Sequence, residues 1–255
     1  MTVPTSPTLA SLADGYRAAV FGASGGIGAA FVRQLAADPR CAQVSAGSRN
    51  GGPVSGAAPD RVTPFAFDLT DEASIAAAAA VAGEEGPLDL VIVATGILHG
   101  PDLSPEKTLR ALDGDRLIAS YRINAVGPAL IAKHWLPLLA RDRKAVFAAL
   151  SARVGSIGDN RTGGWHGYRA SKAALNQLIR TCSIEVARRN PLAVCAALHP
   201  GTVDTALSQP FQANVTPGKL FSPDMSAGCL LQVIDGLGPG DSGGLFAWDG
   251  APIPY

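Results

Sequence analysis

Two side chains able to move a proton, Tyr168 and Lys172, lie four residues apart in the segment YRASK, residues 168–172. At the start of a helix this spacing puts both on one face, within reach of a shared ligand. A phenol normally titrates near ~10, but a neighbouring ammonium stabilises the phenolate and lowers that pKa. The pair therefore predicts acid–base chemistry, and the alternative is an exposed pair on an amphipathic helix.

The segment GASGGIG, residues 22–28, fits two incompatible motifs. As G-x-S-x-G it would present Ser24 as the nucleophile of a hydrolase, and such an elbow needs an oxyanion-hole donor from an earlier strand-to-helix loop. Only 21 residues precede Gly22, which leaves little room for that loop. The hydrolase is therefore disfavoured.

The second motif is a phosphate-binding turn between a strand and a helix. Gly22 and Gly26 allow a tight turn and close approach of a pyrophosphate, Gly28 lets the helix pack closely, and Ser24 and Ile27 lie in the same turn. The helix start adds unpaired N–H groups and the positive end of its dipole. Together with the Tyr-Lys pair, the turn predicts a nicotinamide dinucleotide site. There the tyrosine gives a proton to a carbonyl as hydride arrives, or the reverse.

These residues must be positioned by the elements around them, and short apolar strands alternate with helical segments along the chain. Such alternation implies right-handed crossovers and a parallel sheet. The predicted fold class is α/β, a single doubly wound parallel sheet of the Rossmann type with helices on both faces. The expected strands are residues 17–23, 42–49, 61–69, 88–96, 145–152, 192–201 and 243–250, and the expected helices are residues 26–39, 71–83, 113–141, 168–189 and 224–236.

Residues 1–255 are predicted to form one domain, with residues 1–15 flexible and residues 205–223 acting as a substrate lid. A hydrophobic fraction of 47% suits a sizeable core, and zero net charge argues against a nucleic-acid partner. The chain shows no basic leader, and no apolar run approaches the ~20 residues of a membrane span. The four cysteines lack metal-ligand spacing. We expect a cytoplasmic protein with no membrane partner and no bound metal.

GASGGIG and YRASK, at this separation in such a sheet, resemble the short-chain dehydrogenase/reductase family along essentially the whole chain. The segment LSARVGSIGDNRTGGWHGYRASKAALN, residues 150–176, is most similar to the C-factor-like and Sniffer-like carbonyl reductase branch. The resemblance implies an oxidoreductase that interconverts a carbonyl and a secondary alcohol. In it Tyr168 is the acid–base group, Lys172 lowers its pKa and holds the ribose, and Ser151 orients the carbonyl. Asn124 kinks helix 113–141 and supports a proton relay.

Three departures from the family pattern affect this transfer of roles. Ala94 in VATG replaces an asparagine that mainly braces the sheet, so structural compensation is expected. Phe21 stands where a threonine is common. The position of the family's catalytic serine holds Ala152, so Ser151 is one residue early and would point to the opposite face unless a bulge re-aims it. Ser156 is the alternative to Ser151.

Cofactor choice depends on charge after the second expected strand. That strand ends in GSRN without an acidic residue, and Arg49 could pair with a 2′-phosphate, although a solvated surface arginine is the alternative. NADP(H) is therefore predicted over NAD(H). The resemblance implies adenine contacts from Asp68 and Leu69. The other implied cofactor contacts are Ala94 and Gly96 after the fourth strand, and Pro200, Gly201, Val203 and Thr205 in the loop PGTVDT.

Several aromatic side chains could border the substrate. Trp165, His166 and His99 are candidates for the pocket wall, and Phe211 and Phe221 in the lid suggest an apolar substrate. His199 is expected to bond to backbone at the end of a buried strand. Family members commonly pair through long helices or the last strand, which implies a homo-oligomer by analogy.

A hypothesis of another class is a dinucleotide-binding regulatory or signalling protein with little turnover. The displaced serine and the developmental role of C-factor-like relatives motivate it. This hypothesis predicts cofactor binding without hydride transfer to any small-molecule carbonyl or alcohol.

Overall fold

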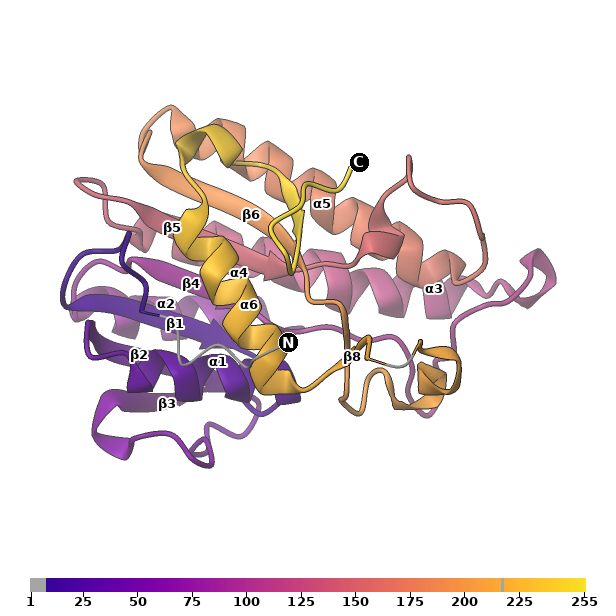
Figure 1. The fold of residues 1–255 in the computed structure, drawn as a ribbon, viewed down its shortest axis with the longest axis horizontal. Helices are drawn as coiled ribbons and strands as arrows, with labels where there is room; N and C mark the ends of the chain where they lie inside the picture. The colour runs from indigo at the N-terminus through magenta and orange to yellow at the C-terminus, as the bar shows by residue number, and fades with distance from the viewer. Residues whose placement is uncertain (1–7, 217) are drawn as a thin grey trace.

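The computed structural model describes residues 8–216 and 218–255, and it confirms the doubly wound α/β fold (Figure 1). Seven parallel strands form one sheet in the order β3-β2-β1-β4-β5-β6-β9. The order reverses between β1 and β4, the switch point where such sheets bind ligands at the carboxyl ends of their strands. The strands are β1 Tyr16–Phe21, β2 Cys41–Ser48, β3 Val62–Ala66, β4 Leu90–Val93, β5 Ala145–Leu150, β6 Ala193–His199 and β9 Leu245–Ala247.

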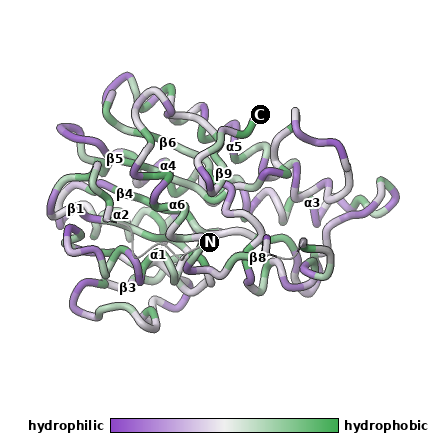
Figure 2. Tube along the Cα trace, in the orientation of Figure 1, coloured by the Kyte–Doolittle hydropathy of each residue, from purple (hydrophilic) through white to green (hydrophobic). Residues whose placement is uncertain are grey.

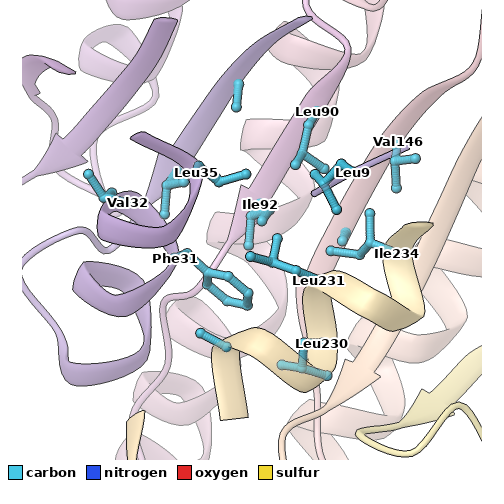
Figure 3. Packing of buried hydrophobic residues seen from close by; sticks show 14 of the residues in the cluster. Leu9, Phe31, Val32, Leu35, Leu90, Ile92, Val146, Leu230, Leu231 and Ile234 are labelled. Atoms are coloured by element: carbon cyan, nitrogen blue, oxygen red, sulfur yellow. The ribbon is translucent and has the colours of Figure 1, made fainter. Parts of the chain in front are cut away.

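Helices pack on both faces of the sheet because successive strand residues point to opposite sides. Ala18 and Val20 of β1 belong to the core under α1 (Gly26–Ala37) and α6 (Pro223–Gly236), part of which appears in Figure 3. Ala19 and Phe21 belong to the opposite core. That core lies under α2 (Glu72–Glu84), α4 (Gly127–Trp135) and α5 (His166–Ala187). In Figure 2 the central strands are largely green and purple gathers in the surrounding loops.

Phe21 replaces the threonine that is common in the family, and the structure supplies a packing reason. Its ring makes edge contacts with Phe65, Phe67 and Trp135 at centroid distances of 5.5, 4.9 and 4.7 Å. Edge-to-face packing at these distances is favourable beyond the area that it buries. The aromatic cluster therefore stabilises the face of the sheet under α2 and α4.

The helix expected over residues 113–141 is interrupted. It comprises α3 (Gly114–Tyr121), a π-helical turn (Arg122–Val126) and α4, and Asp113 caps its start by accepting from the Arg116 N–H. Asn124 lies in the π turn, as the predicted kink requires. Single π turns are frequent at functional sites because they re-aim side chains.

The N-terminal part differs from the flexible segment expected over residues 1–15. Residues 1–7 lie outside the described residues, but Leu9 and Leu12 are buried in the core beside α6. A small parallel sheet that the sequence pattern did not predict pairs β7 (Thr202–Val203), just before the lid, with β8 (Leu220–Phe221) near the end of the lid. Within residues 8–216 and 218–255, no helix has the length and apolar character needed to cross a membrane.

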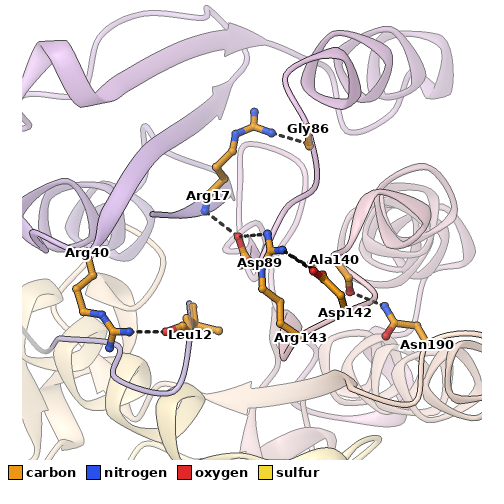
Figure 4. A network of polar contacts seen from close by, with 9 residues as sticks. All are labelled: Leu12, Arg17, Arg40, Gly86, Asp89, Ala140, Asp142, Arg143 and Asn190. Atoms are coloured by element: carbon orange, nitrogen blue, oxygen red, sulfur yellow. Dashed lines mark hydrogen bonds and ion pairs between the residues drawn. The ribbon is translucent and has the colours of Figure 1, made fainter. Parts of the chain in front are cut away.

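A buried carboxylate stabilises the amino ends of the central strands, away from the switch point. Asp89, fully buried before β4, accepts hydrogen bonds from the Arg17 N–H at 3.0 Å and from Arg143 Nε at 2.5 Å (Figure 4). A buried carboxylate needs such partners because the interior solvates its charge poorly.

Candidate active site

The glycine turn joins β1 to α1 with very little space between backbone atoms. Gly22 has φ +86°, a conformation that favours glycine, and a Cβ on Gly28 would lie 2.1 Å from the Gly22 carbonyl oxygen. Gly25 precedes α1 without a side-chain cap, so the first N–H groups of α1 have no such partner. The turn therefore suits an anionic group at the helix start.

A cavity of about 550 Å³ opens along this turn at the carboxyl ends of the strands. The loops after β4 and β6 lie together at this end of the molecule (Figure 1). Twelve of the residues predicted to be catalytic or to bind the cofactor line the cavity: Ser24, Gly26, Ile27, Gly28, Arg49, Ala94, Gly96, Ser151, Tyr168, Lys172, Pro200 and Thr205. The cavity thus brings the glycine turn and the Tyr-Lys pair into one site.

Six others of the predicted catalytic and cofactor-binding residues lie outside the cavity lining. Gly22 is the first residue of the turn and packs against the backbone of Ala94. Asn124 is fully buried behind the site, and Val203 is buried in β7. Leu69 packs against Gly127, and Asp68 lies beside it on the surface. Gly201, with φ +77°, lies against the Phe221 ring, which a Cβ there would approach to 2.8 Å.

Tyr168 and Lys172 project from the first turns of α5. Lys172 Nζ donates to the Leu150 carbonyl oxygen at 2.8 Å and lies 5.8 Å from the centre of the Tyr168 ring. Burial raises the pKa of Tyr168 to about 12 and lowers the pKa of Lys172 to about 8. Burial outweighs the lowering of the phenol pKa that was expected from Lys172, because burial disfavours both charged forms. Tyr168 is consequently a protonated acid at neutral pH.

Ser151 lies just beyond β5 and lines the cavity despite its early position in the sequence. Its N–H donates to the Leu198 carbonyl oxygen at 2.7 Å, and its hydroxyl donates to Asn176 Oδ1 at 2.6 Å. Ser156 follows a 3-10 turn (Arg153–Gly155), is not among the cavity-lining residues, and accepts from the Asp159 N–H. The geometry favours Ser151 over Ser156.

Asn124 braces the loop after β4 through both ends of its amide. Its Oδ1 accepts from the Ile97 N–H and its Nδ2 donates to the Ile97 carbonyl oxygen, each at 2.8 Å. The same Nδ2 donates to Ser171 Oγ at 3.1 Å. These bonds hold the loop that begins at Ala94, so they supply the compensation expected where the family has an asparagine.

Two polar residues that the sequence did not single out, Thr95 and Glu106, have a role at or beside the site. Thr95 lines the cavity, and its hydroxyl is buried without a hydrogen-bond partner among the described residues, as expected where a bound ligand would supply one. Glu106, 4% exposed, accepts from the Gly167 N–H at 3.0 Å and so caps the start of α5. Sequence spacing gives no signal for either residue, because both depend on chain segments meeting in space.

Two residues expected at the adenosine end of the cofactor, Arg49 and Asp68, carry opposite charges. Arg49 follows β2 and lines the cavity. The Thr70 N–H and hydroxyl donate to Asp68 and hold its pKa below the usual value, so this carboxylate stays charged beside the adenine end that the family resemblance implies.

Of the predicted pocket-wall residues, His99 lines the cavity and Trp165 contacts the Tyr168 ring, whereas His166 does not line it. Phe221 is buried against Trp248, so it stabilises the lid. His199 Nδ1 is buried, and the expected hydrogen bond to it is not formed by any of the residues that the structure describes. Burial, with Arg153 nearby, lowers the His199 pKa to about 4.

Comparisons with known proteins agree with this geometry. The family model described as short chain dehydrogenase matches residues 17–216. The chain is 34% identical to C-signal of Myxococcus xanthus over 67% of this chain and 94% of that protein. It is 32% identical to 1-hydroxy-2-glutathionyl-2-methyl-3-butene dehydrogenase of Rhodococcus sp. (strain AD45) over 92% and 98% of the two chains. The NADPH-bound carbonyl reductase from chicken fatty liver superposes with a TM-score of 0.81 and 28% identity, covering 96% of each chain.

Proposed function

Because the chain belongs to the short-chain dehydrogenase family, we propose that it is an NADP(H)-dependent oxidoreductase that interconverts a carbonyl and a secondary alcohol. The observation that carries this proposal is one cavity lined both by the glycine turn and by Tyr168, Lys172 and Ser151. One cleft therefore holds a turn that can bind a pyrophosphate and a side chain that can donate a proton. This combination suits hydride transfer coupled to proton transfer.

The residues around the cleft fit the cofactor. The uncapped start of α1 and the close Gly22–Gly28 contact suit the pyrophosphate, and Arg49 suits a 2′-phosphate. The similarity to a carbonyl reductase that was solved with NADPH supports the same choice. When bound, the nicotinamide supplies the hydride for reduction or accepts it for oxidation.

Each polar side chain at the reacting end has a distinct task. Tyr168, protonated at neutral pH because its pKa is about 12, donates a proton to the carbonyl oxygen in the reductive direction. The Lys172 ammonium then stabilises the phenolate. Ser151 must turn its hydroxyl away from Asn176 Oδ1 to donate to the substrate oxygen. Asn124 positions the loop after β4 through Ile97.

The test is a panel of ketones and aldehydes assayed with NADPH and with NADH. We expect turnover with a preference for NADPH. A Tyr168→Phe variant should bind NADPH as the wild type does and lose about 10²- to 10⁴-fold in kcat, the usual contribution of a general acid. Full activity in that variant would contradict the assignment of Tyr168.

A second candidate is a dinucleotide-binding regulatory protein with little turnover. The similarity to C-signal supports it, and so does the Ser151 hydroxyl, which is already engaged by Asn176. It predicts NADPH binding without oxidation of NADPH by any compound in the panel. The panel therefore distinguishes the two candidates.

A further inference from the structure

A row of four aromatic rings, here called the ring row, leads from the cavity into the lid. Centroid distances are 5.8 Å from His99 to Phe211, 5.0 Å from Phe211 to Trp165, and 6.2 Å from Trp165 to Tyr168. All three pairs are tilted or edge-on, the arrangements that ring quadrupoles favour. His99 and Tyr168 line the cavity, and Phe211 and Trp165 pack behind them.

The ring row is assembled from separate parts of the chain. His99 follows β4, Trp165 and Tyr168 belong to the start of α5, and Phe211 lies in the 3-10 segment Gln209–Asn214 of the lid. His99 Nε2 lies 2.9 Å from the Ala206 carbonyl oxygen, which links the loop after β4 to the lid. The contact between His99 and the Ala206 carbonyl oxygen therefore adds to the packing of the rings in holding the loop after β4 against the lid.

Trp165 is held in an unfavourable backbone conformation. Its φ is +53°, the only positive φ recorded for a non-glycine residue in the described part of the chain. Bulky side chains rarely adopt this region, so the surrounding structure must impose it. The Trp165 N–H donates to the Glu106 carbonyl oxygen at 2.5 Å, which fixes the backbone that directs the indole toward the ring row.

The reacting end of the cavity has few charged side chains that could bind a substrate. Ile97, Ala206 and Leu207 line it beside His99, and the Lys172 ammonium is occupied by the Leu150 carbonyl oxygen. Arg49, the other cation of the described lining, lies on the far side of β1 and β4. A substrate carboxylate would have no free cationic partner near Tyr168 among the described lining residues.

We propose that the substrate is an uncharged ketone or aldehyde that carries an aromatic or conjugated planar ring beside the carbonyl. Phe211 and Trp165 determine this specificity as positioning residues, because they hold the His99 and Tyr168 rings that line the cavity. This inference rests on the proposed function, because the ring row matters only when a carbonyl compound binds next to Tyr168. A planar ring packs against the ring row edge-on or offset, whereas a saturated ring of the same size lacks the matching quadrupole.

The test compares equilibrium binding of acetophenone and cyclohexyl methyl ketone, which differ only in the saturation of the ring. Binding is measured by ligand-observed NMR to the full-length protein alone and with NADP⁺, so neither sample contains a hydride donor. We expect acetophenone to bind about 3- to 10-fold more tightly, the value of one well-oriented aromatic pair. Phe211→Leu and Trp165→Leu, which keep apolar bulk but remove a ring, should bring the ratio to within about twofold of one.

Leu220→Ala is the matched control, because Leu220 lies in the same lid on β8, partly exposed and outside both the cavity and the ring row. It should keep the wild-type ratio. Equal binding of the two ketones, no binding of either, or an unchanged ratio in Phe211→Leu would overturn the proposal. If the preference holds but no compound of the carbonyl panel oxidises NADPH, the proposed function fails and the binding preference stands.

Discussion

Lys172 is buried with 3% of its surface exposed, and this burial gives the site a measurable pH signature. Burial lowers its pKa in the folded protein to about 8 from 10.5. Between these two pH values the unfolded chain holds more protons than the folded one, so this lysine contributes increasing stability as pH rises. Near neutral pH, folding must bury its charge.

We predict that Lys172→Met is stabilised relative to the wild type near pH 7, and that this advantage shrinks by about 2 kcal/mol between pH 8 and pH 10. Taking the difference between the two proteins cancels the buried cysteines, whose pKa values are also raised. The measurement is urea unfolding of cofactor-free protein across this range. A constant difference would mean that Lys172 is solvated like a surface lysine.

Arg49 is exposed after β2 and lines the cavity, so its substitution should change cofactor choice more than folding. A charge-assisted hydrogen bond to a phosphate is worth about 1.5–3 kcal/mol. We expect Arg49→Asp to raise KM for NADPH by about 10- to 100-fold and to leave KM for NADH nearly unchanged. Equal changes in KM for both cofactors would mean that Arg49 does not bind the 2′-phosphate.

At the scale of single residues, the sequence predicted which side chains are reactive better than it predicted what those side chains contact. The spacing of Tyr168 and Lys172 predicted their common cavity, because a helix places residues four apart on one face. Register predicted that Ser151 would point away, but β5 ends at Leu150, so strand alternation no longer applies to Ser151. The pKa of Tyr168 could not be predicted from its neighbours in sequence, because burial by distant segments dominates it.

At the scale of elements, the start of α5 depends on a residue far away in sequence. The Glu106 carboxylate accepts from the Gly167 N–H, and the Glu106 carbonyl oxygen accepts from the Trp165 N–H. Tyr168 follows directly, so this contact sets the position of the acid. A buried N–H that loses its acceptor costs about 1–3 kcal/mol.

We therefore predict that Glu106→Ala lowers the free energy of unfolding by about 1–3 kcal/mol and lowers kcat, because the first turn of α5 loosens. Glu106→Gln keeps an acceptor and should stay within about 1 kcal/mol of the wild type. Chemical denaturation and steady-state kinetics give both values. A Glu106→Ala protein as stable and active as the wild type would show that α5 begins without this cap.

The expected elements were confirmed where the apolar pattern was strong, in the continuous apolar runs of β4 and β5 and in the long helix α5. The lid was less predictable. The pairing of β7 with β8 joins two-residue strands that are separated by a long loop, and so short a strand has no recognisable periodicity. Its packing depends on Phe221, which lies against Gly201 and Trp248.

At the scale of the whole molecule, the N-terminal segment completes the core under α6. Leu9 is fully buried among residues such as Leu90, Val146 and Ile234 (Figure 3). Its N–H donates to Asp38 Oδ2 at 3.0 Å, and the Tyr16 hydroxyl donates to the same oxygen at 3.0 Å. Residues 1–15 were expected to be flexible, but within the described residues 8–15 both Leu9 and Leu12 are buried in this core.

Leu9→Ala should therefore reduce the free energy of unfolding by about 2–4 kcal/mol, since it leaves a cavity at a closely packed site. For a chain of this length that corresponds to a loss of about 4–16 °C in Tm. Thr8→Ala is the matched control, because Thr8 is exposed and its contact with Ala10 uses only the backbone carbonyl oxygen. Leu9 is far from the cavity lining, so NADPH affinity at 25 °C should be unchanged in both variants. A Tm for Leu9→Ala equal to that of Thr8→Ala would mean that the core under α6 is complete without the N-terminal segment.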